Sequence, residues 1–371
     1  MAKGIGRNGE LFRDLCDPAH LMRAARRAAR GKRTKPDVAA FLLEMEPQCF
    51  ALGAQLAAGD WRPGQYTSFY IAEPKVRLIS AAPFCDRVVH HAMVALLEPH
   101  FERRFVAHSY ACRVNKGTHR ALLRAATLSR KRKYVLKGDV VKFFPSIDHD
   151  VMKAQVARVI SDERLLRVLA HIIDGSNPQE PVQEWYEGDD LFCGALRRRG
   201  LPIGNLTSQF LANVLLDKLD HAVMDDLGFG DYVRYCDDFL VFGDSRQQLW
   251  QARANIERVL GGLRLRLHPR KGGVHCTGST IPFLGFTLRN GHRRLQHDGV
   301  VRATRRLRKA GQEVAAGYMS ADQLRTRVAA WMGHAMHASN QAVVDTVLAR
   351  AGVGRAAGNA SNFFSGVSQI A

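Results

Sequence analysis

The sequence lacks the features of a secreted, zinc-binding or membrane-spanning protein. Its seven cysteines are odd in number and include no Cys-x-x-Cys pair, so they predict neither a disulfide framework nor a zinc module. No run approaches the roughly 18 uninterrupted apolar residues of a membrane-spanning helix, and the N-terminal segment has no apolar core of a signal peptide. We therefore expect a cytoplasmic protein in a reducing compartment, with no membrane association.

Acidic residues are scarce relative to basic ones. The 371 residues include 54 Lys and Arg but only 35 Asp and Glu, which gives a formal net charge of +19. Such an excess is typical of proteins that neutralise the phosphates of nucleic acids, although charge alone does not establish that function. With 46% hydrophobic residues, the composition is otherwise that of a globular protein longer than one typical domain.

The N-terminal part of the chain is predicted to be helical. Apolar residues recur at helical spacing in two segments between residues 18 and 60, and Gly59 ends the second of them. From 66 to 80, alternating apolar and polar residues predict a β-hairpin whose turn lies near Glu73 and Pro74.

The second half of the chain is predicted to alternate helices and strands. A polar loop rich in glycine and proline spans 174–200, and one long helix follows it over 206–228. Two short strands flank Asp237 and Asp238. Further elements are expected in this order: strands in RLRLHPRKG and TIPFLGFTL, a helix in VRATRRLRKAGQEVAAG, and a helix with Ser320 and Gln323 as its capping box.

Three aspartates stand where predicted strands end. Asp139 ends the strand YVLKG, and Asp237 and Asp238 form the tip of the hairpin YVRYCDDFLVF. Aspartates favour tight turns, which is one interpretation of this pair. Both flanks are apolar, however, so two like charges are forced together beside a core and require a cation. Carboxylates from separate strands can hold two divalent metals roughly 3.5 to 4 Å apart, and we assign the shared role to Asp139 and Asp237, with Asp238 more peripheral.

Five segments occur in the order and approximate spacing of the palm motifs of reverse transcriptases. They are GDVVKFF, LPIGNLTSQ, RYCDDF, LHPRKG and PFLGF. The tetrad YCDD resembles the Tyr-x-Asp-Asp signature of that family, and Asp139 matches its first-motif aspartate. The resemblance implies an α+β right-hand polymerase fold, with fingers and palm built from an antiparallel palm sheet plus helices, and a helical thumb.

The resemblance also implies a domain organisation and a metal site. The expected parts are an N-terminal helical extension (1–65), fingers and palm (66–290), a helical thumb (291–350) and a flexible tail (351–371). Asp139, the Val140 carbonyl and Asp237 are expected to bind two Mg²⁺ ions, with Asp238 completing the acidic site. Mn²⁺ is an alternative metal.

Four residues match family positions that contact the incoming deoxynucleoside triphosphate. Lys75 and Arg77 match fingers residues that hold the triphosphate, with surface solubility as their alternative role. Phe144 matches the ring that abuts the sugar C2′ and excludes ribonucleotides, with core packing as its alternative. Lys271 falls one position away from the lysine proposed to protonate the leaving pyrophosphate.

The turn LPIGN has an apolar residue where a connecting turn usually carries a polar one. Ile203 is either a buried anchor or a surface for a docking molecule, and the resemblance places it beside the nascent base pair. In retroviral enzymes the matching residue is a glutamine that hydrogen-bonds around the nucleotide. We expect Ile203 to give shape contact only, Gly204 to let the backbone approach, and Asn205 and Gln209 to order the helix start.

The C-terminal helices are basic and are expected to contact the template RNA and the cDNA. In PFLGF, the glycine and aromatic residues resemble the grip on the primer strand. Phosphate contacts of the thumb are assigned to Arg302, Arg305, Arg306 and Arg308.

Over roughly residues 10–345, the sequence resembles the reverse transcriptases of diversity-generating retroelements. The segments that carry this resemblance are EPKVRLISAAPFCDRVVHHAM, EPHFERRFVAHSYACRVNKGTHRAL and LPIGNLTSQFLANVLLDKLDHAV. In that family the enzyme copies a template-repeat RNA into cDNA, misreads template adenines and thereby diversifies a target gene. The resemblance implies a small basic accessory variability protein as a partner.

Two other functions are retained as alternatives. The first is a group II-like reverse transcriptase of intron mobility or phage defence. The sequence shows no endonuclease or zinc-bearing extension, no Val-Thr-Gly thumb signature and no integrase-like domain, which favours the retroelement family over these branches. The second is a catalytically idle RNA-binding protein with a polymerase fold. The intact set of Asp139, Asp237 and Asp238 argues against it, because burying uncompensated acids is costly.

Overall fold

The computed structural model describes most of the chain. The described residues are 5–6, 9–72, 75–176, 184–186, 188–190, 192–340 and 342–353. They belong to two compact units, the first comprising residues 1–115, 137–239 and 250–273, and the second comprising 116–136, 240–249 and 274–371. Each unit contains both helices and strands, and the fold class is α+β, as the sequence predicts.

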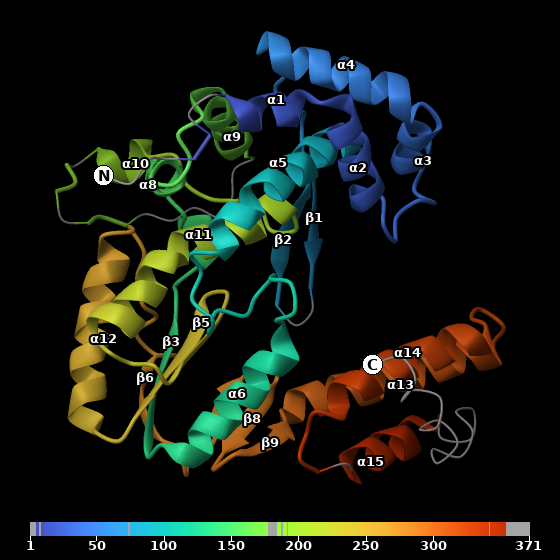
Figure 1. Cartoon of the computed structure of the whole chain (residues 1–371). Helices are drawn as coiled ribbons and strands as arrows, with labels where there is room; N and C mark the ends of the chain where they lie inside the picture. Colours follow the sequence, from blue (N-terminus) through green and yellow to red (C-terminus); the bar gives the residue numbers. More distant parts are fainter. Residues whose placement is uncertain are drawn as a thin grey trace. The chain divides into compact units, whose positions relative to one another are not determined.

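Helices form the N-terminal part of the first unit (Figure 1). They are α1 (Glu10–Cys16), α2 (Pro18–Ala28), α3 (Pro36–Leu43), α4 (Met45–Ala58) and α5 (Phe84–Glu102). The chain leaves helical geometry at Glu44, which divides the expected second helix into α3 and α4. Gly59 ends α4 in the left-handed conformation, with φ 82°, as the sequence predicts.

The predicted hairpin is present between α4 and α5. Strands β1 (Thr67–Ile71) and β2 (Arg77–Ala81) pair antiparallel, with Thr67 opposite Ala81 and Ile71 opposite Arg77. The predicted turn at Glu73 and Pro74 lies outside the described residues.

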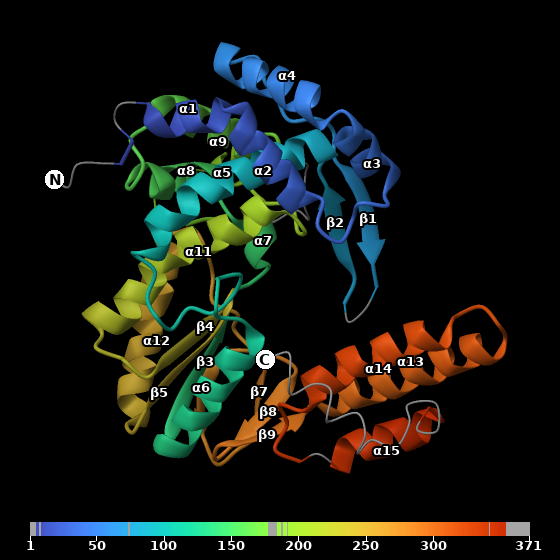
Figure 2. The same ribbon diagram turned by 45° about the vertical axis from the view of Figure 1, so that its right-hand side comes forward.

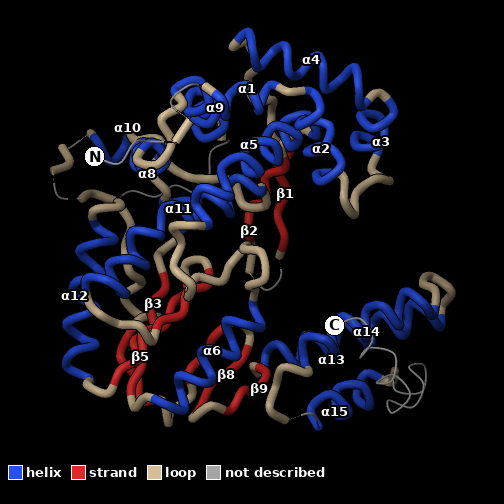
Figure 3. The backbone as a smooth tube through the Cα atoms, in the orientation of Figure 1, coloured by secondary structure: helices blue, strands red, loops and turns tan. Residues whose placement is uncertain are grey.

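A four-stranded sheet carries the three aspartates. Its strands are β3 (Tyr134–Asp139), β4 (Tyr232–Tyr235), β5 (Asp238–Gly243) and β6 (Gly273–Cys276), drawn in red in Figure 3. The strand order is β4-β5-β3-β6, so β5 and β3 are neighbours. This order places the ends of two strands that are distant in sequence beside each other.

The segment RLRLHPRKG was expected to be a strand and is not one. Only an isolated antiparallel bridge joins Leu267 to Val140. Arg264 adopts a left-handed conformation with φ 55°, and His268 Nδ1 accepts hydrogen bonds from the backbone amides of Arg270 and Lys271. These local bonds turn the chain before a strand can form.

The remaining helical elements of this part of the chain follow the hairpin. They are α7 (Phe143–Ser146), α8 (His149–Ala157), α9 (Glu163–Asp174), α10 (Cys193–Leu196), α11 (Leu206–His221), the π-helix η1 (Ala222–Asp226) and α12 (Arg246–Gly261). The helix expected over 206–228 therefore changes to π geometry after His221. The loop expected over 174–200 contains the short helix α10, and part of that loop lies outside the described residues.

The second unit packs helices around a small antiparallel sheet. Its elements are α6 (Thr118–Lys131), β7 (Ile281–Phe283), β8 (Phe286–Arg289), β9 (His292–Leu295), α13 (His297–Ala315), α14 (Ala321–Ala335) and α15 (Ala342–Ala351). The sheet order is β7-β8-β9, and α6 packs against β8. In Figure 2, α13 and α14 lie side by side, and α13 also contacts α15. Ser320 and Gln323 form the predicted capping box of α14.

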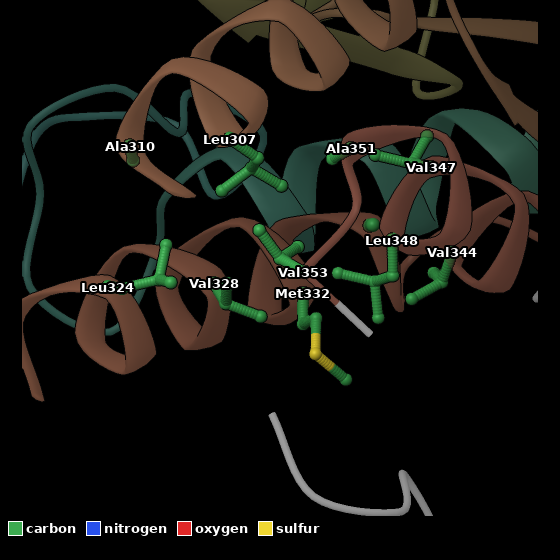
Figure 4. Packing of buried hydrophobic residues seen from close by; sticks show 11 residues of the cluster. Leu307, Ala310, Leu324, Val328, Met332, Val344, Val347, Leu348, Ala351 and Val353 are labelled. Atoms are coloured by element: carbon green, nitrogen blue, oxygen red, sulfur yellow. The ribbon is translucent and has the colours of Figure 1, made fainter. Parts of the chain in front are cut away.

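Apolar side chains from α13, α14 and α15 form one core (Figure 4). Leu307 of α13, Val328 of α14 and Val347 of α15 are among its buried members. Val353, just after α15, also belongs to it, whereas the remainder of the predicted flexible tail, 354–371, lies outside the described residues. The second unit includes residues 274–290, which the sequence assigns to the palm, so the domain boundaries remain predictions.

None of the helices in the described ranges is both long enough and apolar enough to cross a bilayer. All seven cysteines are free thiols.

Candidate active site

The three predicted aspartates lie together at one end of β3 and β5. Asp139 is the last residue of β3, Asp237 precedes β5, and Asp238 begins β5. The charge of Asp139 raises the pKa of both Asp237 and Asp238, so the three carboxylates are within electrostatic reach of one another. The structure therefore brings together the side chains that the sequence assigns to metal binding.

Burial is the main cause of the shifted pKa values in this group. It raises the pKa of Asp238 to about 7; Lys137 opposes the rise, and Asp139 and Asp237 add to it. Burial likewise raises the pKa of Asp237, Asp139 adds to the rise, and Arg77 opposes it. A cation at this position would offset both the lost hydration and the mutual repulsion of the carboxylates.

One carboxylate oxygen of Asp238 is left without a hydrogen bond. Its Oδ1 atom is buried and accepts none from the described part of the chain. The nearest ion-pair partner is Lys137 Nζ on β3, at 3.6 Å, which is longer than a hydrogen bond. A buried carboxylate oxygen in this state is a suitable ligand for a hard, oxygen-binding cation.

Gly138 allows β3 and β5 to approach closely beside the aspartates. A Cβ atom at this position would lie 2.1 Å from Cζ of the Phe239 ring. Phe239 is fully buried, and its ring occupies the space that any larger residue at 138 would fill. Because Gly138 precedes Asp139 and Phe239 follows Asp238, this contact holds the two strand ends together.

The backbone after Asp139 directs an oxygen toward the same site. Val140 and Leu267 form an antiparallel bridge whose hydrogen bonds are made by the residues on either side of them. In such a pair the C=O of the bridging residue points away from its partner. Because the partner segment leads into β6, on one side of β3, the Val140 carbonyl points to the other side, where β5 lies.

The donor set fits Mg²⁺ if substrate completes it. Across the described ranges, no three acidic, histidine or cysteine side chains come close enough to enclose a metal ion by themselves. Mg²⁺ typically takes one or two carboxylates and completes its octahedron with water and substrate phosphates. The acids at the ends of β3 and β5, together with the Val140 carbonyl, supply such a partial set.

A buried arginine supports the turn that carries Asp237. Cys236, the residue before Asp237, has a left-handed backbone with φ 55°. Its carbonyl accepts a hydrogen bond of 3.2 Å from Arg234 Nη1. The Arg234 guanidinium also donates to both carboxylate oxygens of Asp220 on α11, and Ser109 and Asn213 accept its remaining bonds. This buried hydrogen-bond network stabilises the strained turn at Cys236.

Sequence reasoning missed Arg234 and Asp220. A usable signal was present, because Arg234 interrupts the apolar strand YVRYC and Asp220 is the one acidic residue among the buried residues of α11. Two opposite charges at buried positions predict a pair, since each alone would be costly to bury.

Lys271 lies at the acidic centre. Its Nζ donates a hydrogen bond of 2.8 Å to Asp139 Oδ2, and about half of the side chain is exposed. The turn of the segment RLRLHPRKG places it there, because His268 N–H also donates to the Asp139 carbonyl at 2.7 Å. The predicted role of Lys271 at pyrophosphate is untested, but its position beside the aspartates agrees with that role.

The two fingers residues are exposed. Arg77 begins β2, and its charge lowers the pKa of Asp237, so it faces the acidic centre. Lys75 lies just before β2 and is also exposed. Both side chains are accessible to a substrate, and their assignment to the triphosphate remains a prediction.

The LPIGN turn is joined by backbone hydrogen bonds to Phe144, a predicted nucleotide contact, and to β2. The Leu201 amide donates to the Phe144 carbonyl at 3.0 Å, and the Ser80 amide of β2 donates to the Ile203 carbonyl at 3.3 Å. Phe144 and Ile203 are half-buried, whereas the neighbouring Phe143 is in the core. Phe144 therefore has the exposure that a contact with substrate requires.

The start of α11 differs from the prediction. Gly204 is exposed with φ 110°, and a Cβ there would lie 3.2 Å from Ile79 Cγ2, which explains the glycine. Asn205 occupies the N-cap, but its side chain makes no capping hydrogen bond, and its buried Nδ2 has no partner among the described residues. The exposed Gln209 contributes only a backbone bond to the Asn205 carbonyl. The expectation that these two side chains order the helix start is therefore wrong.

The four thumb arginines do not share one face of α13. Arg302 and Arg306 line a groove of about 720 Å³ between α13 and α14, with Trp331 in its wall. Arg308 instead donates to the Arg350 carbonyl at the end of α15. Arg305 is exposed and does not line the groove. A nucleic-acid strand in this groove would meet Arg302 and Arg306.

Comparison with known proteins gives a family match over residues 71–288, to the model described as reverse transcriptase (RNA-dependent DNA polymerase). This segment covers more than half of the chain and includes the acids, the LPIGN turn, β2 and only the last residue of β1.

Three relatives illustrate the range of similar proteins. Protein YkfC of Escherichia coli K12 is 26% identical over 274 residues, which cover 63% of this chain and 69% of YkfC. Nuclear intron maturase 1, mitochondrial, of Arabidopsis thaliana is 31% identical over 133 residues, 34% of this chain and 19% of the maturase. Group II intron-encoded protein LtrA of Lactococcus lactis subsp. cremoris is 24% identical over 175 residues, 46% of this chain and 27% of LtrA. The match thus spans a minor part of the two intron proteins.

Proposed function

The chain belongs to the reverse transcriptase family, the RNA-dependent DNA polymerases, and we propose that it is the polymerase of a diversity-generating retroelement. In this proposed role it copies a template-repeat RNA into cDNA and introduces errors at template adenines. The observation that carries the proposal is the aliphatic Ile203 in a turn tied to both Phe144 and β2.

Ile203 is well placed to weaken the checking of the incoming base. A branched aliphatic side chain gives shape contact but offers no hydrogen bond, whereas glutamine at the matching position of retroviral enzymes does. A site that hydrogen-bonds its substrate discriminates strongly because a wrong partner leaves buried polar groups unpaired. Without that penalty, mispairs are rejected by shape alone, which relaxes fidelity.

The acidic centre performs the chemistry in this proposal. Asp139, Asp237 and the Val140 carbonyl would hold two Mg²⁺ ions, and Asp238 would complete the site. When bound, the ions supply positive charge that stabilises the attacking and leaving oxygens of the in-line displacement. Lys271, 2.8 Å from Asp139, is near enough to this centre to give a proton to the departing pyrophosphate.

The residues around the acids position the substrates. Lys75 and Arg77 bind the triphosphate, with the guanidinium forking across two phosphate oxygens. The half-buried Phe144 ring lies against the sugar C2′ and excludes a 2′-hydroxyl. Arg302 and Arg306 hold phosphates of the template RNA and cDNA in the thumb groove.

The test is the error spectrum of the cDNA. Purified chain, template-repeat RNA, the small basic accessory variability protein and all four deoxynucleoside triphosphates are combined, and the products are sequenced. We expect substitutions concentrated at template adenines, and fewer of them with the Ile203→Gln variant. An Ile203→Leu variant is the matched control and should keep the parental spectrum. Errors spread evenly over the four template bases would contradict the proposal, and an unchanged spectrum for Ile203→Gln would make Ile203 a packing anchor only.

A group II-like reverse transcriptase of intron mobility or phage defence is the second candidate. The names of two relatives, an intron maturase and a group II intron-encoded protein, favour it. It predicts faithful copying of adenines in the same assay, with no effect of the accessory protein. The two candidates therefore differ in a single sequencing experiment.

A further inference from the structure

A small cavity in the first unit is lined by helices that do not carry the acidic centre. Its volume is about 300 Å³, and its walls come from α1, the end of α4, the segment after α4, and α9. None of the residues that line it belongs to β3, β5 or the LPIGN turn. The cavity is therefore separate from the site at which nucleotides are joined.

The floor of the cavity is apolar and buried. Phe12, Leu56, Trp61 and Val168 form it, and none of them is more than 7% exposed. These side chains belong to the core of the helical region, so the floor is rigid. Its volume is at the lower end of the range of small-molecule pockets, and is suited to about one nucleotide unit.

The charged residues of the rim are all basic or histidine. Among the described residues that line the cavity, the charged or titratable ones are Arg62, Arg164, Arg167 and His171. No acidic side chain lines it within that set. A concave site with positive charge only and an apolar floor attracts an anion that carries an uncharged body.

Two of the arginines are held in fixed positions. Arg164 lies over the Phe12 ring, 4.1 Å from its centroid, and donates to the Ala57 carbonyl at the end of α4. Arg62 donates to the carbonyls of Gly59 and Trp61. Each guanidinium keeps further N–H groups that these carbonyls do not use. Capping α4 explains the positions of these two arginines but not the presence of Arg167.

Hydrogen bonds to Asp162 join the helices α1 and α9 next to the cavity. Asp162 is buried; one of its oxygens accepts from the Phe12 amide of α1, and the other accepts from the Leu165 amide as the N-cap of α9. Both oxygens thus accept from backbone amides, and no ion pair joins Asp162 to a rim arginine among the described residues. This bond fixes α1 to α9, the two helices that bring Phe12 and Arg164 to the cavity.

Arg167 and His171 remain available to a ligand. Arg167 is exposed and makes no hydrogen bond or ion pair with the described residues. His171 lies one turn further along α9, on the same face, and is half-buried. Burial and then Arg62 lower its pKa, while Asp174 raises it, so the ring is a neutral hydrogen-bonding group near pH 7.

We propose that this cavity is a second anion site, which binds a phosphate ester through Arg62, Arg164, Arg167 and His171 while the attached sugar or base rests on the apolar floor. An RNA strand is the source that the overall charge of +19 favours, because the rim would then anchor one backbone phosphate of the template away from the acids. A free nucleotide has the same chemistry.

The experiment measures binding of a fluorescein-labelled single-stranded RNA to the full-length chain by anisotropy over a series of KCl concentrations. Arg167→Gln should weaken binding roughly tenfold at low salt and reduce the slope of log K against log salt by about 0.7, the value for one lost single-strand phosphate contact. Arg167→Lys, which keeps the charge, should retain the parental slope.

The control is Arg258→Gln, which removes an equally exposed arginine from α12. It changes net charge identically, and its slope should equal that of the parent. A parallel calorimetric titration with adenosine monophosphate separates the two sources. If Arg167→Gln abolishes binding of the monophosphate but leaves the RNA slope unchanged, the phosphate site stands and its ligand is a free nucleotide. If Arg167→Gln and Arg258→Gln have the same effect on binding of both probes, the inference is overturned. Thermal unfolding is the folding control, and equal midpoints will show that both variants are folded.

Discussion

Two charge clusters, one fully buried and one half-buried, lie within a few residues of each other, and they are built in opposite ways. In the closed cluster, Arg234 and Asp220 are fully buried, and the guanidinium is surrounded by acceptors from several segments. In the open cluster, Asp237 and Asp238 are half-buried, and the buried Oδ1 atom of Asp238 has no hydrogen bond among the described residues. The first compensates its charge fully by internal contacts. In the second, Lys271 and Lys137 compensate three carboxylates only in part, so negative charge is left for a cation.

The difference separates a structural role from a chemical one. Removing either partner of a closed cluster lowers the free energy of unfolding, because the other charge is left buried alone. An open cluster of acids is destabilising by itself, and the raised pKa of Asp238 reports that cost. We infer that the closed cluster holds the Cys236 turn in place so that the open one can be presented to metal.

The largest expected effect comes from neutralising the open cluster. Asp237→Asn should lower primer extension in magnesium by about a thousandfold, because the charge stabilisation that metals provide is worth several kcal/mol. Its thermal stability should be equal or higher, since burial raises the pKa of the carboxyl that is removed. Steady-state extension and thermal unfolding measure the two quantities. Asp226→Asn, at an exposed aspartate, is the control, and normal extension by Asp237→Asn would refute the assignment.

Removing one charge of the closed cluster should lower the stability of the fold. Asp220→Asn leaves the Arg234 charge buried without its carboxylate and should lower the free energy of unfolding by about 3 to 5 kcal/mol. Urea unfolding measures the loss. Asp225→Asn, which removes the exposed partner of His221, should cost no more than about 1 kcal/mol. If Asp220→Asn and Asp225→Asn lower the free energy of unfolding equally, the buried pair has no special structural role.

Asp217 lies one turn from Asp220 on α11, and its Oδ1 atom is 3.6 Å from His221 Nε2 but accepts no hydrogen bond from the described residues. Its shifted pKa predicts a pH dependence of stability. Burial, with Asp220 adding, raises its pKa from 3.8 to about 6. The folded state therefore binds more protons than the unfolded state, so stability should fall as pH rises from about 4 to about 6, by about 2 to 3 kcal/mol from this group. Asp217→Asn should reduce the decline across that window by about 2 to 3 kcal/mol, and the raised pKa of Asp238 should leave a decline of its own in the variant. A decline of the same size in the variant would show that other groups cause it.

A smaller effect is expected from the contact that joins the two strands. Gly138→Ala places a Cβ against the Phe239 ring and should cost about 1 to 3 kcal/mol of stability through overpacking, with reduced extension because the aspartates are displaced. Gly333→Ala, in open space on α14, should be neutral or stabilising by roughly 1 kcal/mol. Differential scanning calorimetry of the pair provides the measurement. If Gly138→Ala costs no more stability than Gly333→Ala, β3 and β5 can move apart without a loss of stability.

The sequence predicted the features that depend on local pattern. The hairpin of β1 and β2, the end of α4 at Gly59 and the capping box at Ser320 all follow from residues within a few positions of one another. The meeting of Asp139 with Asp237 and Asp238 was predicted because each ends a strand.

Features that depend on distant partners were not predictable in the same way. Arg234 finds its carboxylate fourteen positions away on α11, and Lys271 meets Asp139 across 132 positions. Arg308 belongs to a basic run, but packing of α15 turns it away from the groove. In each case the partner is chosen by tertiary packing, which no local pattern encodes.

The most direct test of the open cluster is its response to metal without any reaction. Thermal unfolding of the full-length chain is measured with and without Mg²⁺, for the parent and for Asp237→Asn. A ligand that binds only the folded state raises its stability, so the midpoint of the parent should rise with Mg²⁺ and that of the variant should not. Equal responses of the two proteins would contradict the claim that these aspartates are left open for a cation.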